Sequence, residues 1–243
     1  MSVYISFLIG LVFLNAQTAS LPKNAPISVL SSIKTVDIEH TSEIDTFDPT
    51  WVDSLSLSLP CYGVPVPKRT MRLPNAPRNY RNGTHRGLDF FANWGTPVRS
   101  VADGIVVRSD LHYEEVPADF RENLLKATTK VGHTPSDIFN SVLLGKSVFL
   151  DHGFDLIPGF RTISIYAHLS HIEKEIVPGA IVKRGELLGK SGNTGMREST
   201  VGSKAGSHLH WELILQKEGK EIYLGEGMSN PELYDMLSRI FIQ

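Results

Sequence analysis

The sequence predicts a mainly β domain that carries a helical insertion and a C-terminal helix. From about residue 87 onward, short apolar runs are separated by glycine and proline, a pattern typical of short strands joined by tight turns. ISIYAHLS, which begins at Ile163, alternates with a period of two and places Ser164, Tyr166 and His168 on one face. Helical spacing interrupts this pattern in three places.

The predicted strands follow from these runs and from the turn residues between them. VPGAIVKRGELLGKSGNTG, for example, holds glycines at 179, 185, 189, 192 and 195, which suits closely spaced turns. In chain order the expected strands are 87–91, 97–101, 104–108, 147–152, 162–168, 180–183, 187–190, 208–215 and 221–224.

Two neighbouring helical stretches predict an insertion at about 110–146. ADFRENLLKATTKV has a capping pair in Asp119 and Glu122. TPSDIFNSVLLG offers Thr134 as N-cap and Gly145 as stop. The apolar residues at helical spacing in the first stretch are Phe120, Leu124, Ala127 and Val131.

SNPELYDMLSRIF predicts the C-terminal helix. Ser229 stands at its expected N-cap, and Glu232 follows three residues later.

Composition and charge restrict the class of protein. The 243 residues are 41% hydrophobic and 21% charged, as in ordinary globular proteins, and the formal net charge is −2. We therefore expect neither a nucleic-acid partner nor a membrane-surface protein. The single cysteine, Cys61, excludes an intramolecular disulfide framework. The sequence predicts no particular oligomeric state.

The N-terminal part predicts export and a spacer. Residues 1–20 contain a nearly pure apolar run that is too short to span a bilayer and suits a secretory signal peptide, although no Lys or Arg precedes it. A buried helix is the alternative interpretation. Residues 21–75 form an acidic segment with a Pro-rich continuation, and 76–243 form the domain. Residues 21–60 hold six acids and two bases. We expect this segment to be either a spacer or a latency segment that covers the site.

Histidines in three motifs indicate a metal site. HRGLD supplies His85 and Asp89, and YAHLS supplies His168. In GSHLHWEL, His208, His210 and Glu212 share one strand face, opposite Leu209, Trp211 and Leu213. Two imidazoles on one strand face are costly without partners. Two His and one Asp suit a catalytic zinc with an open fourth position and a net charge of about +1. The helix-borne zinc motif, a nucleophile elbow, a P-loop and a dinucleotide fingerprint are absent from the sequence.

The motifs together resemble a known family. THRGLDF, GTPVRSVADGIVV, VFLDHG, YAHLS, VKRGELLGKSGNTG and SHLHWEL, in this order over roughly residues 76 to 215, are similar to the lysostaphin-type zinc metalloendopeptidases, metallopeptidase family twenty-three. The resemblance implies an antiparallel β-sheet crossed by a groove. It also implies one Zn²⁺ per chain held by His85, Asp89 and His210, with His168 and His208 as catalytic residues beside the metal-bound water.

The resemblance implies a secreted peptidase that cleaves peptide bonds in peptidoglycan cross-links or stem peptides, in the periplasm or at the cell wall. No stable membrane insertion is expected once the signal is removed. A non-catalytic cell-wall-binding or hydrolase-activator protein of the same fold is the alternative, and a peptidase of other proteins is a third possibility. About forty residues between Ser109 and Ser147, and an extension between SGNTG and SHLHWEL, exceed the family's usual turns. Both are expected at the groove rim.

Overall fold

The computed structural model describes residues 46–242 and confirms the mainly β fold class. The expected signal peptide and residues 21–45 lie outside the described residues. The strands are β1 (Leu57–Ser58), β2 (Pro77–Arg78), β3 (Gly83–Thr84), β4 (Leu88–Phe90), β5 (Pro97–Arg99), β6 (Gly104–Ser109), β7 (Val148–Asp151), β8 (Arg161–Ala167), β9 (Leu169–Ile172), β10 (Ile181–Val182), β11 (Leu187–Ser191), β12 (Leu209–Lys217), β13 (Lys220–Tyr223) and β14 (Phe241–Ile242).

A seven-stranded antiparallel sheet forms the frame of the domain. Its order is β10-β6-β7-β8-β12-β13, and β4 also pairs with β12. A second antiparallel sheet has the order β5-β11-β9. All nine predicted strands overlap strands of these two sheets. Short β2 and β3 form a hairpin of their own, and β1 pairs with β14 in parallel.

The two faces of the large sheet have different environments. On β12, Leu209, Trp211 and Leu213 belong to the main core, together with Tyr166 of β8. The opposite face carries a smaller apolar cluster of Phe139, Leu143, Leu144, Ile165, Ala167 and Ile214. The predicted division of β12 into two faces is therefore confirmed, and His210 and Glu212 lie on the face of the smaller cluster.

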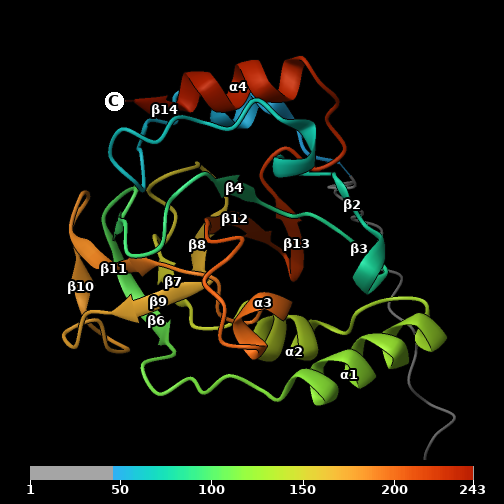
Figure 1. Cartoon of the computed structure of the whole chain (residues 1–243). Coiled ribbons are helices and arrows are strands. Elements are labelled where there is room, and N and C mark those ends of the chain that lie inside the picture. The colour runs from blue at the N-terminus through green and yellow to red at the C-terminus, as the bar shows by residue number, and fades with distance from the viewer. Residues whose placement is uncertain (1–45, 243) are drawn as a thin grey trace, which may run out of the picture. The chain divides into compact units, whose positions relative to one another are not determined.

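The helices lie on two sides of this domain. α4 (Glu232–Ile240) lies near β14 and the N-terminal part of the described chain, whereas α1 (Ala118–Val131), α2 (Ser136–Ile138) and α3 (Arg197–Thr200) gather at the other end (Figure 1). A π-helical turn, Phe139–Leu143, continues α2. Three 3₁₀ turns occupy Pro49–Val52, Thr70–Arg72 and Asn79–Arg81. The helical insertion and the C-terminal helix are thus confirmed.

The buried face of α1 differs from the prediction. Phe120 and Val131 are 52% and 59% exposed, and Ala127 is also exposed. The residues that α1 buries are Arg121 and Thr128, each one position after a residue of the predicted stripe and so about 100° round the helix. Hydrophobic spacing was misleading because this helix faces a pocket and not the main core.

The helix starts also differ from the predicted caps. Pro117, Pro135 and Pro231 precede α1, α2 and α4, and none of these helices has a side-chain cap. Asp119 lies inside the first turn of α1, and the Thr134 hydroxyl donates to the carbonyl of Arg81. Proline fixes a backbone φ that suits the start of a helix, so no polar cap is needed to set the boundary.

Residues 46–75 are part of the domain core. We expected them to precede the domain, but they supply many buried side chains, and β1 pairs with β14 at the far end of the sequence. The core residues in this segment are Phe47, Val52, Leu55, Leu57, Leu59, Cys61, Val66 and Leu73. The compact unit therefore extends well upstream of the boundary expected at residue 76.

Among residues 46–242, no helix has both the length and the apolar composition needed to cross a bilayer.

Candidate metal centre

Strands β4 and β12 place two of the expected metal ligands side by side. Asp89 and His210 are directly opposite each other in the antiparallel pair. His85 reaches the same point from the segment before β4. The chain crosses β12 so closely at Gly87 that a Cβ there would lie 2.2 Å from the carbonyl oxygen of Trp211. The glycine of HRGLD is therefore required by this close approach.

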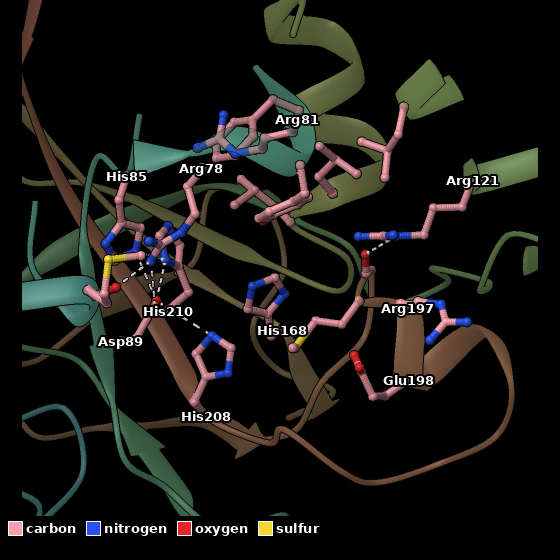
Figure 2. A pocket seen from close by; sticks show the side chains of 18 of the residues that line it. Arg78, Arg81, His85, Asp89, Arg121, His168, Arg197, Glu198, His208 and His210 are labelled. Carbon is pink, nitrogen blue, oxygen red and sulfur yellow. Dashed lines mark hydrogen bonds and ion pairs between the residues drawn. The ribbon is translucent and has the colours of Figure 1, made fainter. Parts of the chain in front are cut away.

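Three ligand atoms converge at this point (Figure 2). The Oδ1 atom of Asp89 lies 2.9 Å from His85 Nε2 and 2.9 Å from His210 Nδ1. The two imidazole nitrogens are 3.1 Å apart. His85 and His210 are almost fully buried, so the cluster is shielded from solvent on its inner side.

The outer atoms of each ligand are already bonded. His85 Nδ1 donates to the carbonyl of Leu73 at 2.8 Å, and His210 Nε2 donates to Glu212 Oε1 at 2.8 Å. In the neutral rings, the facing nitrogens then carry lone pairs. Two lone pairs and a carboxylate oxygen that meet at one point fit a cation, and the outer bonds fix the tautomers as in known zinc sites.

The charges agree with this interpretation. Burial lowers the pKa of His85, which keeps the ring neutral. Burial also opposes the charge on His210, but hydrogen bonds to Asp89 and Glu212 outweigh it and raise the pKa to about 9. A proton held between His210 and Asp89 occupies the place where a metal cation would bind.

His168 and His208 lie beside this cluster. Their ring centroids are 4.9 Å apart, and the His168 ring is 5.7 Å from that of His210. His168 Nδ1 donates to the carbonyl of Thr194 and His208 Nδ1 to that of Gly206. Their Nε2 atoms are thus the nitrogens left for a substrate or a proton, and His208 Nε2 lies 3.5 Å from Asp89 Oδ1.

The position of His168 corrects one prediction. The alternation of ISIYAHLS placed Tyr166 and His168 on one face. In the structure, His168 has a φ of 60°, which ends β8 and turns the ring to the side opposite Tyr166. A left-handed conformation is uncommon for a non-glycine residue and costs on the order of 1–3 kcal/mol. The chain thereby delivers His168 to the metal cluster.

The residues that support the metal ligands were not predicted from the sequence. Arg78 Nη2 contacts Asp89 Oδ2 at 3.0 Å, and Arg86 Nη2 contacts Glu212 Oε2 at 3.0 Å. Arg81 and Arg86 both stack on the ring of Phe139, at 4.5 and 4.7 Å. The position of Glu212 on the face of His210 was a usable signal, but the arginines gave none.

A pocket of about 590 Å³ opens over the metal cluster. Its walls come from the β2–β3 region, from α1 and the π-helical turn, and from the loop that leads into α3. All five predicted site residues line it, with His168 between the metal cluster and Arg121 (Figure 2). The insertion therefore forms part of a pocket wall.

His152, which directly follows β7, does not line this pocket. Its Nδ1 donates to the carbonyl of Asp103 at 2.6 Å, and its Nε2 contacts the hydroxyl of Ser164 at 2.7 Å. The ring thus joins β7, β8 and the turn before β6, and a structural role follows from these contacts.

Comparison with known proteins assigns the class. Residues 127–223 match the family model "Peptidase family M23". This match supports the lysostaphin-type metallopeptidase class that the motifs predicted. The match includes His168, His208 and His210. His85 and Asp89 precede it and join the site through β4.

The chain is also similar to individual proteins. The chain is 30% identical over 128 residues to an uncharacterized metalloprotease of Haemophilus influenzae, covering 53% of this chain and 18% of the relative. It is 29% identical over 140 residues to the peptidoglycan DD-endopeptidase ShyA of Vibrio cholerae, covering 58% and 22%. The matches thus span about a fifth of either relative. The catalytic domain of lysostaphin from Staphylococcus simulans has a TM-score of 0.36 at 20% identity, covering 70% and 87%.

Proposed function

We propose that this protein is an exported zinc metalloendopeptidase that hydrolyses peptide bonds in peptidoglycan cross-links or stem peptides. The observation that carries this proposal is the convergence of His85, Asp89 and His210, flanked by two further imidazoles, at the base of one pocket. The relative named as a peptidoglycan endopeptidase supports the choice of substrate.

Zinc fits the donor set, and when bound it polarises a scissile carbonyl and lowers the pKa of water to about 7. Two neutral imidazoles and one carboxylate would hold it with a position open towards the pocket. Arg78 and Glu212 stabilise the ligands from outside, since each bonds the atom of Asp89 or His210 that faces away from the cluster.

His168 and His208 would move the protons. Burial, followed by the charges of His208 and His210, holds the pKa of His168 well below its usual range, so its Nε2 is free to accept a proton. His208 lies on the other side of the opening, with Nε2 towards Asp89. It is placed to stabilise negative charge on the carbonyl oxygen of the substrate or to protonate the leaving amine.

The proposed substrate also determines the place of action. Peptidoglycan lies outside the cytoplasmic membrane, so the enzyme must be exported. The apolar run at residues 3–14 suits a signal peptide for that purpose. We propose the periplasm or the cell wall as its location, and peptides of peptidoglycan as its partner.

The experiment that tests this function measures zinc content and peptidoglycan hydrolysis together, for the wild type, His208→Ala and His85→Ala. We expect His208→Ala to retain zinc and to lose activity by about 100-fold or more, since general acid–base groups contribute 10²–10⁴-fold. His85→Ala should lose both.

Two results would contradict the proposal. Zinc-loaded wild type that releases no amino groups from any peptidoglycan would favour the binding-protein alternative. Cleavage of casein at a rate comparable with peptidoglycan would favour a peptidase of other proteins.

A further inference from the structure

The inserted helix α1 turns an arginine towards the pocket. Arg121 is only 7% exposed, whereas the neighbouring Phe120 is 52% exposed. Figure 2 shows Arg121 across the pocket from the metal cluster, with His168 between them. Arginine is rarely buried while a neighbouring phenylalanine is exposed, so this arrangement indicates a role for the charge of Arg121.

Most of this guanidinium group has no partner. Arg121 Nε donates to the carbonyl of Gly195 at 2.9 Å. Within residues 46–242, neither Nη atom makes a hydrogen bond or an ion pair, and the residue lines the pocket. The two Nη groups therefore remain as hydrogen-bond donors for a ligand in the pocket. A ligand would also offset the free energy that an unpaired charge costs when it is buried.

Two carboxylates near Arg121, those of Glu115 and Glu122, bond to other partners. Glu115 Oε2 accepts from the Gly195 amide at 2.9 Å and from the Ser199 hydroxyl at 2.5 Å. Its Oε1 accepts from the Tyr113 hydroxyl at 2.9 Å. The following residue on α1, Glu122, pairs with Arg197 at 3.8 Å. Within the described residues, neither Glu115 nor Glu122 forms an ion pair with Arg121.

One loop ties Arg121 to the reaction centre. The carbonyl of Thr194 holds His168, and the next carbonyl, of Gly195, holds Arg121. A Cβ on Gly195 would lie 2.6–2.7 Å from backbone atoms of the insertion, so this loop is packed closely against it. Neighbouring carbonyls of one loop therefore hold both Arg121 and His168.

We propose that Arg121 binds a carboxylate of the peptide substrate next to the bond that is cut. This inference rests on the proposed function and specifies its substrate class as a peptide with a free carboxylate adjacent to the scissile bond. The paired Nη donors match the two oxygens of a carboxylate in a bidentate contact. The specificity comes from the insertion, since α1 supplies the arginine.

The test uses a synthetic stem-peptide cross-link in two forms, with the carboxyl group beside the scissile bond either free or converted to a carboxamide. Binding and kcat/KM are measured for both forms with the full chain. We expect the wild type to favour the free acid by about 10- to 100-fold, the range for hydrogen bonds to charged groups. Arg121→Gln should remove this preference, because kcat/KM falls more for the free acid than for the amide. Arg121→Lys should retain part of it.

Lys126→Gln is the matched control, because it removes the same charge from an exposed position of α1. It should keep the full preference. Equal binding of acid and amide by the wild type, or an equal loss for both peptides in Arg121→Gln, would overturn the proposal. Preferential binding of the acid without any cleavage would support the carboxylate site and contradict the proposed peptidase function instead.

Discussion

Glu212 is the residue that links the metal site to its surroundings. It is fully buried, accepts from His210 Nε2 and pairs with Arg86. Hydrogen bonds to His210 and the positive charge of Arg86 outweigh burial and lower its pKa, so the carboxylate is charged. Its negative charge then makes His210 a better metal ligand.

We predict that Glu212→Gln weakens zinc binding by about 10- to 100-fold, the usual effect of losing a group that orients a metal ligand. Competition with a chromogenic chelator measures the affinity. Glu221→Gln on the neighbouring β13 is the control, because that side chain is exposed. An affinity that equals the wild-type value would show that the Glu212 carboxylate does not support the site.

His152 makes the stability depend on pH. Burial lowers the pKa of its ring in the folded protein below the ordinary 6.5. Below pH 6.5 the His152 ring therefore binds a proton in the unfolded chain but stays neutral in the folded protein. The free energy of unfolding consequently falls as the pH falls. The contribution is complete above pH 6.5 and decreases by up to about 1.4 kcal/mol per pH unit below it.

Urea unfolding of wild type and His152→Gln at pH 7.5, 6.5 and 5.5 tests this prediction. Glutamine offers one donor and one acceptor, as the neutral ring does, but does not titrate. We expect the variant to lose less stability than the wild type between pH 6.5 and 5.5. Parallel curves would show that His152 does not titrate in this range.

Among the elements, the π-helical turn connects the insertion to the sheet. Phe139 is 8% exposed, and its ring contacts the guanidinium groups of both Arg81 and Arg86. Arg86 is also the partner of Glu212. The same turn packs Leu143 against Ile165 and Ala167 of β8 in the smaller apolar cluster. Phe139 of the insertion contacts Arg86, Arg86 pairs with Glu212, and Glu212 accepts from the ligand His210. This series of contacts connects the insertion to the metal site.

We predict that Phe139→Leu costs about 1–3 kcal/mol of unfolding free energy, because two cation–π contacts are lost and the packing is altered. Phe120→Leu makes the same change on the exposed side of α1 and should stay within about 0.5 kcal/mol. Urea midpoints at constant m-value give both numbers. Similar costs for the two variants would contradict the anchoring role.

The elements also show where sequence-based prediction succeeded. All nine expected strands formed because alternation and turn residues report local structure. β9 was missed because His168 divides a run that looks continuous in the sequence. The buried face of α1 was wrong because a pocket, which brings together distant segments, decides which side of that helix is covered. Arg86 and Arg78 were missed for the same reason.

At the scale of the whole molecule, the upstream segment 46–75 belongs to the fold. Nothing local in its sequence revealed this, because β1 finds its partner only at β14. Eight side chains of this segment are buried in the main core. At roughly 1.5–3 kcal/mol for each large one, their burial is comparable with the whole stability of a domain, about 5–15 kcal/mol.

We therefore predict that a protein shortened to begin at Thr46 unfolds cooperatively, whereas one that begins at Ala76 does not fold. Thermal unfolding followed by circular dichroism, with zinc present for both, distinguishes them. A cooperative transition in the shorter protein would show that residues 46–75 are dispensable.

The protein that begins at Thr46 also tests the latency hypothesis. Residues 46–60 lie in the core or beside it, so the part of the acidic segment left to cover the pocket is 21–45. Equal peptidoglycan hydrolysis with and without these residues would identify them as a spacer. Higher activity of the shortened protein would support latency.

The pairing of β1 with β14 also sets the order of events during synthesis. Phe241 of β14 packs on Phe90, next to Asp89, and on Trp211, next to His210. A nascent chain that already contains the four site histidines and Asp89 therefore still lacks a wall of the core behind them. The ligands acquire their final support only after the last strand has been translated. Tight metal binding is therefore expected only once β14 has paired with β1 in the folded domain.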